Sequence, residues 1–223
     1  MPRPDVTHRS KKKLLTLAAF ELFIKQGYER TTIAQIMEAA KLTKAGIYHY
    51  YSSKEDVLDA AIAYALEQDT ENLARQIKSY PVEKRMLLLM QGALGSNGLV
   101  SKLFHYHYTD RDLYAAYRIR ELTVHAYIPF MEHVIREGIE KGLYRTKYPA
   151  QAAGFIIILG KCLSECSMPG GKEKQEYRFQ AFLELIEALL KPSLGHMADI
   201  RQLCEKYLQG TYGKNEKNFI PEA

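Results

Sequence analysis

The stretch TTIAQIMEAAKLTKAGIYHYYSSKEDVL, residues 31–58, decides the fold because it holds the start signals of three helices in succession. Thr32 is placed to cap a helix in which apolar residues recur at helical spacing: Ile33, Ile36, Met37 and Ala40. One face of this helix can therefore be buried against neighbouring helices. We expect it to be the supporting member of a helix pair.

A second helix is expected after a tight turn at Lys41 and Leu42, where the apolar pattern is interrupted. Thr43 is its candidate N-cap. Ile47 and Tyr51 are four residues apart, so both side chains can turn inward together. The surface left outward is small, basic and aromatic, and it consists of Lys44, Ala45, Tyr48 and His49.

Such a helix fits the major groove of DNA, which is about 12 Å wide. The small residues Ala45 and Gly46 would let its backbone approach the base edges. A third helix follows, with Ser52 or Ser53 as its cap. Lys54 stands in the first turn of that helix, where a cation and free backbone N–H groups suit a phosphate.

Together these residues resemble the DNA-binding domain of the TetR (tetracycline-repressor-like) family of bacterial regulators. The resemblance rests on the Thr before the supporting helix, the small residues that open the recognition helix, Tyr48, Tyr51 and the run of residues 53–55. The sequence departs from the family at Lys41, where Gly is usual, and at Tyr50, where His is frequent. A residue other than Gly is tolerated in the turn if its φ is negative or only modestly strained.

The resemblance implies which residues contact DNA. By matching motif positions, it implies base or groove contacts by Thr43, Lys44, Ala45, Tyr48 and His49. It implies phosphate contacts by Thr32, Tyr50 and Lys54. In this family the last two long helices pair with those of a second subunit, so the resemblance also implies a homodimer.

Composition permits this function without proving it. The chain has 223 residues, 47% of them hydrophobic, which is enough for one large or two modest domains. A net charge of +5 is only mildly basic. The Lys11–Lys13 cluster, with Arg3 and Arg9, either reaches phosphates beside the motif or is a solvated helix face or loose tail.

Cysteine usage and hydropathy predict a cytoplasmic protein. Three cysteines are too few for a disulfide framework, and no apolar N-terminal segment suggests secretion. The most apolar run, residues 155–159, is far shorter than the roughly 18–20 residues that span a bilayer. We therefore expect no membrane partner.

The predicted fold class is all-α, with an N-terminal helix-turn-helix domain over residues 1–55, a larger helical regulatory and dimerisation domain over 56–210, and a flexible tail over 211–223. Residues up to Val6 are expected to be loose, with Thr7 capping a first helix that Gly27 ends. The inner face of this helix is predicted to be Leu14, Leu17, Ala18, Leu22 and Ile24.

The remaining helices follow from apolar spacing and breakers. One runs from Lys54 without Gly or Pro until Pro81, and another, capped by Asp110 or Asp112, runs to Gly142 with Pro129 kinking or dividing it. Two more are expected over residues 149–166 and 174–190, and a short one over 199–208. Either a dimer interface or an intramolecular core accounts for their apolar residues Phe155, Ile158, Leu159, Phe182, Ile186 and Leu189.

A ligand pocket is predicted in the middle of the chain, where aromatic and histidine residues gather. Its candidate residues are Tyr106, Tyr114, Tyr117, Glu121 and His125, and core packing is the alternative interpretation of this stripe. His105 and His107 would face different sides of a helix, so no metal site is expected. Cys162 and Cys166 are interpreted as small buried hydrophobes, with a metal or redox role as the alternative.

The leading functional hypothesis is a homodimeric, ligand-responsive repressor that binds a palindromic operator in double-stranded DNA and is released by an unknown small-molecule effector. No catalytic motif or cofactor-binding loop is present, so the sequence predicts neither an enzyme nor a cofactor. Two alternatives remain open. One is a protein-binding adaptor or an activator with the same fold, and the other is an enzyme fused to a helix-turn-helix domain.

Overall fold

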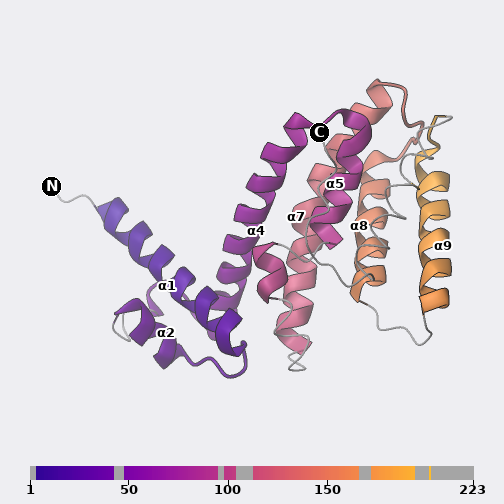
Figure 1. Ribbon diagram of the computed structural model, residues 1–223. Helices are drawn as coiled ribbons and strands as arrows, with labels where there is room; N and C mark the ends of the chain where they lie inside the picture. Colours follow the sequence, from indigo (N-terminus) through magenta and orange to yellow (C-terminus); the bar gives the residue numbers. More distant parts are fainter. Residues whose placement is uncertain are drawn as a thin grey trace. The chain divides into compact units, whose positions relative to one another are not determined.

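The computed structural model describes residues 4–42, 48–94, 98–103, 113–165, 172–193 and 201. All regular structure within these ranges is helical, which confirms the all-α prediction for them. The helices, labelled as in Figure 1, are α1 (Pro4–Gln26), α2 (Ile33–Ala40), α4 (Lys54–Ser79), α5 (Val82–Leu94), α7 (Leu113–Glu140), α8 (Pro149–Glu165) and α9 (Lys172–Leu190). Residues 99–103 are also helical.

The chain divides into two compact units. The first comprises Met1–Thr70 and Ser96–Thr123, and the second comprises Glu71–Gly95 and Val124–Ala223. Both α4 and α7 contribute residues to each unit. The domain limits at residues 55 and 210 remain a prediction.

In the first unit, α1 packs against α2. The residues that α1 buries are Leu15, Ala19, Phe20 and Phe23. The predicted inner face was therefore wrong: Leu14 is 52% exposed, and Leu17, Ala18, Leu22 and Ile24 are only partly covered. Apolar residues occupy most of this helix's circumference, so spacing alone did not select a face, and the two phenylalanines offer more apolar area to bury.

The start of α1 also differs from the prediction, because the helix begins at Pro4 and not after Thr7. Proline is tolerated in a first turn, where its missing N–H has no helical partner to lose. The predicted end is confirmed. Gly27 takes a left-handed φ of 85°, and its N–H donates to the Phe23 carbonyl at 3.0 Å.

The predicted long helix after Lys54 is confirmed as α4, which ends at Ser79 just before Pro81. The apolar residues that recur along it are buried: Val57, Leu58, Ala61, Ile62, Ala65, Leu66, Leu73 and Ile77. In α2 the central residue Ile36 is fully buried. These helices were predictable because each presents one clear apolar stripe.

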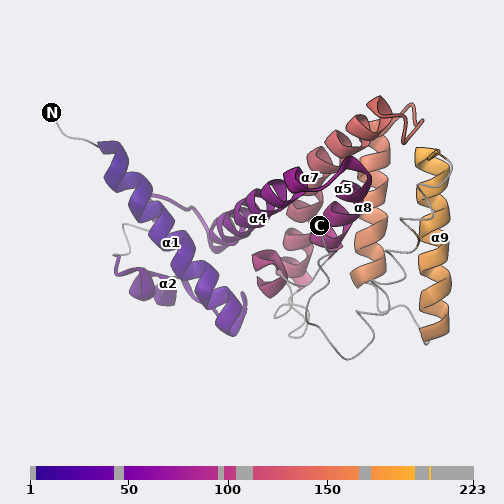
Figure 2. The same cartoon turned by 45° about the horizontal axis from the view of Figure 1, so that its top comes forward.

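In the second unit, α8 packs against both α5 and α9, between which it lies in Figures 1 and 2. The predicted helices over residues 149–166 and 174–190 correspond to α8 and α9. Pro129 lies on the exposed side of α7 and does not divide that helix. Asp110, Asp112, Cys166 and the predicted helix over 199–208, apart from residue 201, lie outside the described residues.

A buried tyrosine closes the end of α7 in this unit. Gly142, with a φ of 73°, ends the helix, and the Leu143 N–H donates to the Gly138 carbonyl at 2.8 Å. The chain then returns Tyr144 over Gly138, where an added Cβ would lie 2.3 Å from the ring. The Arg145 N–H donates to the Leu190 carbonyl at 2.9 Å, which fixes this turn to the end of α9.

Among the described helices, none has the length and hydropathy of a bilayer-spanning segment.

Candidate nucleic-acid interface

The supporting helix α2 is closed at its start by a reciprocal cap. The Gln35 N–H donates to Thr32 Oγ1 at 3.2 Å, and the Thr32 N–H donates to Gln35 Oε1 at 2.8 Å. The Gln26 side chain also donates to Gln35 Oε1 at 3.1 Å, which links the end of α1 to this cap. Thr32 is thus confirmed as the N-cap, and its exposed hydroxyl lies at the positive end of the helix.

The turn after α2 places Lys41 in the left-handed region, with a φ of 54° and a ψ of 42°. Its N–H donates to the Glu38 carbonyl at 3.1 Å, and the Leu42 N–H donates to the Met37 carbonyl at 3.0 Å. This is the helix end that glycine normally occupies, so a lysine there carries backbone strain of about 1 kcal/mol. Lys41 thus adopts the left-handed turn that Gly usually forms in the family, and it does so with backbone strain.

Tyr51 anchors the end of the candidate recognition segment to α1. Its ring is buried, and its hydroxyl lies 2.6 Å from Thr16 Oγ1. Because the Thr16 hydroxyl donates to the Lys12 carbonyl at 3.0 Å, Tyr51 is the donor in the bond to Thr16. Burial raises the pKa of Tyr51. The prediction that Tyr51 turns inward is confirmed, whereas its predicted partner Ile47 lies outside the described residues.

The side chains just before this anchor face solvent. Tyr48 is 53% exposed, His49 is exposed, and Tyr50 is partly covered. The His49 and Tyr50 rings meet edge to face, with centroids 5.1 Å apart. Thr43, Lys44 and Ala45 lie outside the described residues. An aromatic and imidazole surface is therefore presented at residues 48–50.

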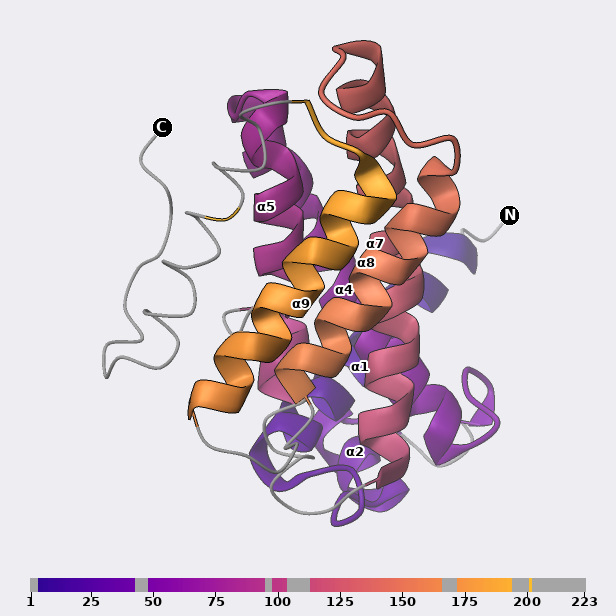
Figure 3. The ribbon, with the colours of Figure 1, turned by 90° about the vertical axis from the view of Figure 1, so that its right-hand side faces the viewer.

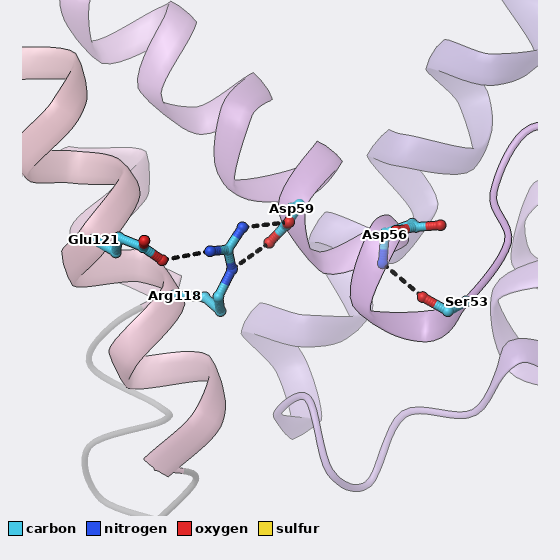
Figure 4. A network of polar contacts seen from close by, with 5 residues as sticks. All are labelled: Ser53, Asp56, Asp59, Arg118 and Glu121. Carbon is cyan, nitrogen blue, oxygen red and sulfur yellow. Dashed lines mark hydrogen bonds and ion pairs between the residues drawn. The ribbon is translucent and has the colours of Figure 1, made fainter.

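The start of α4 is capped by Ser53, whose Oγ accepts from the Asp56 N–H at 3.1 Å (Figure 4). The Asp56 carboxylate accepts from the backbone N–H of Ser52 at 2.9 Å. The sequence left Ser52 and Ser53 open as caps, and this geometry selects Ser53. The adjacent acids Glu55 and Asp56 suit the positive end of the helix.

Lys54 is held by the turn between α1 and α2. Its Nζ donates to the Glu29 carbonyl at 3.3 Å and lies 4.1 Å from the centroid of the Tyr28 ring. The Tyr28 hydroxyl donates to Glu55 Oε1 at 3.1 Å. Burial, and then the charge of Glu55, raise the pKa of Tyr28. The pKa of Glu55 is lowered, chiefly by a backbone hydrogen bond and by Ser53.

Tyr28 and Thr16 were missed as site residues because their partners lie far away in the sequence, Glu55 for Tyr28 and Tyr51 for Thr16. The position of Tyr28, directly after the helix-ending Gly27, was the one sequence signal that a side chain would fold back there. Thr16 holds α1 to Tyr51, and Tyr28 holds the turn after α1 to Glu55. They position the candidate surface without being part of it.

Of the predicted ligand residues, Tyr114, Tyr117 and Glu121 belong to the first unit, where their surroundings differ. Tyr114 packs its ring on Tyr28, with centroids 5.9 Å apart, while Tyr117 is exposed. Glu121 pairs with Arg118, whose Nε also donates to Asp59 of α4 at 2.9 Å (Figure 4). His125 is exposed and belongs to the second unit. Tyr106 lies outside the described residues.

The described part of the chain offers no cluster of metal-ligating side chains. Within it, no group of three or more His, Cys, Asp or Glu side chains is arranged to hold a metal ion. His105 and His107 and the side chains of Cys162 and Cys166 are not among the described residues. The metal and cofactor expectations stay predictions.

Comparison with known proteins identifies the family that this region resembles. Residues 15–61 match the family described as "Bacterial regulatory proteins, tetR family". The HTH-type transcriptional regulator HbdR of Aromatoleum sp. (strain CIB) is 34% identical over 83 residues, 36% of this chain and 36% of that protein. The uncharacterized HTH-type transcriptional regulator YdeS of Bacillus subtilis (strain 168) is 27% identical over 182 residues, 79% of this chain and 86% of that protein.

Solved structures share the fold along most of the chain. RolR in complex with resorcinol superposes with a TM-score of 0.62 at 14% identity, covering 90% of this chain and 95% of that one. A protein from Saccharomonospora viridis in complex with choline has a TM-score of 0.55 at 16% identity, covering 82% of this chain and 98% of that one. The resemblance to the TetR family and the all-α class, with its helix-turn-helix domain and larger helical domain, are both confirmed.

Proposed function

We propose that this chain, whose residues 15–61 match the tetR family, is a transcriptional regulator that binds an operator as a homodimer and releases it when an effector binds. The observation that carries the proposal is the exposed Tyr48 beside the buried anchor Tyr51. An exposed aromatic is available to a base or sugar only if its backbone is held, and the bond from Tyr51 to Thr16 provides that support. Thr43, Lys44 and Ala45 complete the proposed groove surface.

Phosphate contacts are proposed for Thr32, Tyr50 and Lys54, which flank this surface in the sequence. The hydroxyl of Thr32 stands at the start of α2, where backbone N–H groups favour an anion. Lys54 stands in the first turn of α4, with its ammonium against the Tyr28 ring. Such contacts would fix the register on DNA without reading sequence.

The proposed homodimer uses the outward faces of α8 and α9, which lie side by side in Figure 3. On α8, Phe155 and Ile158 are 53% and 46% exposed in the single chain, and on α9 Tyr177 and Leu185 are also exposed. Exposed large apolar side chains that recur on adjacent helices favour burial against another helix pair. Phe182 and Ile186 are already buried, so they support the core interpretation and not the interface.

Palindromic operator binding follows from two-fold symmetry. A symmetric dimer presents two recognition segments to successive major grooves, about 34–36 Å apart. An effector that favours a different separation must weaken DNA binding, and DNA must weaken effector binding by the same factor. The relatives of this fold that hold resorcinol or choline support a small organic effector, and repression is the proposed outcome.

The proposal is tested by fluorescence anisotropy with a labelled duplex taken from upstream of the chain's own gene. Wild-type protein should bind this duplex more tightly than a scrambled duplex, and Tyr48→Ala should lose that preference. Tyr148→Ala is the matched control, because Tyr148 is also an exposed tyrosine but belongs to the second unit. Equal binding to both duplexes by the wild type would favour the adaptor function over DNA regulation.

A further inference from the structure

Three consecutive lysines lie on α1, outside the candidate DNA surface at residues 43–50. We call Lys11, Lys12 and Lys13 the α1 lysine cluster, and all three side chains are exposed. The cluster lies before residue 15, where the match to the tetR family begins. The cluster thus lies on the same helix as the first matched residues, one turn before them.

The cluster has no acidic partner within its own helix. The positions three and four residues away from these lysines carry Thr7, His8, Arg9, Ser10 and residues 14–17, none of which is a carboxylate. No ion pair to the three ammonium groups is found among the described residues. Elsewhere the chain pairs exposed charges in this way, as Arg136 does with Glu132 at 2.7 Å. The cluster thus leaves a local positive charge uncompensated.

The position of the cluster relates it to the candidate DNA surface. The ammonium of Lys12 lies 5.3 Å from the centroid of the Tyr51 ring, and the Tyr51 hydroxyl is bonded to Thr16 one turn further along α1. Tyr51 follows directly after the exposed residues 48–50. Lys12 is therefore held next to that surface by a contact within the first unit, and Lys11 and Lys13 are its neighbours on the same exposed turn of α1.

We propose that the α1 lysine cluster is a second DNA contact, which binds phosphates of the duplex flanking the base pairs met by residues 43–50. This inference rests on the proposed function. Lysine ammonium groups act as point charges on phosphate oxygens and read no base edges. The cluster therefore adds affinity for any duplex and leaves the preference for the operator unchanged.

The test is a salt titration of binding to the upstream duplex and to a scrambled duplex. Each phosphate contact contributes about 0.9 to the slope of log affinity against log salt. Replacing all three lysines with Gln should reduce the slope by roughly 2 to 3, so that affinity falls about 40-fold less than in the wild type between 50 and 200 mM salt. The ratio of specific to scrambled binding should stay at its wild-type value.

Two control variants separate a local contact from bulk charge. The combination of Lys78→Gln, Lys141→Gln and Lys147→Gln removes the same charge from exposed lysines of the second unit and should keep the wild-type slope. Replacing the three lysines of the cluster with arginines keeps their charge and should also keep the wild-type slope. The inference would be overturned if the Gln variant of the cluster kept the salt slope of the wild type or of the second-unit variant. That result would leave the proposed function standing. A wild type that binds neither duplex would overturn the proposed function together with the inference.

Discussion

At the scale of single residues, Lys41 carries backbone strain at the junction between the supporting helix and the recognition segment. Lys41→Gly removes the clash of Cβ in the left-handed region, whereas Lys41→Ala removes the same charge and keeps the clash. We expect the glycine variant to be the more stable of the two by about 1 kcal/mol. Scanning calorimetry of the two variants measures this difference. Equal stability of the two variants would show that the turn relaxes without strain.

Tyr28 makes the free energy of unfolding depend on pH in the alkaline range. Burial and the Glu55 carboxylate favour its neutral form, so its pKa is higher in the folded protein than the value of about 10 in the unfolded chain. The stability from this group is fully present below about pH 10 and is lost as pH rises from there toward the folded pKa. Wild-type protein should therefore lose more unfolding free energy than Tyr28→Phe between about pH 9 and 11. Parallel stability curves for the two proteins would contradict this assignment.

At the scale of helices, one ion pair ties the start of α7 to the start of α4. Arg118 Nε and Nη2 donate to the two carboxylate oxygens of Asp59 at 2.9 and 2.5 Å (Figure 4). Both side chains are partly exposed, so a double-mutant cycle with Asp59→Asn and Arg118→Gln should give a coupling of about 0.5–1 kcal/mol. The exposed pair of Glu132 and Arg136 within α7 should give a smaller value. Additive effects at Asp59 and Arg118 would show that the pair does not tie the helices.

Helix limits were predictable where the signal is local. Thr32 and Gly27 act on backbone groups within one turn, so their neighbours in sequence decide their role. The buried face of α1 was not predictable, because apolar residues surround much of that helix and its partners decide which are covered. The contacts of Tyr28 could not be predicted either, since they join residues that are far apart in the sequence. For the candidate site, sequence identified the surface residue Tyr48 and the inward-turned Tyr51, and it missed their supports Thr16 and Tyr28.

At the scale of the whole molecule, the exposed apolar residues of α8 and α9 predict a dimer. Sedimentation analysis should give twice the chain mass of 25.6 kDa for the wild type. The combination of Phe155→Glu and Ile158→Glu should give the chain mass, because carboxylates would have to be buried at the interface. Leu113→Glu, a change at an exposed leucine of the first unit, should leave the dimer intact. A monomeric wild type would contradict the proposed assembly.

The central claim is sequence-specific DNA binding by residues 43–50 of a two-fold symmetric protein. The most direct test is selection of bound duplexes from a random pool, since the pool contains every candidate half-site and the protein itself selects the operator. We expect the wild type to enrich an inverted repeat whose half-sites present successive major grooves about one helical turn apart, and Tyr48→Ala to lose that enrichment. A pool with no enriched repeat, or the same repeat with the variant, would contradict the claim.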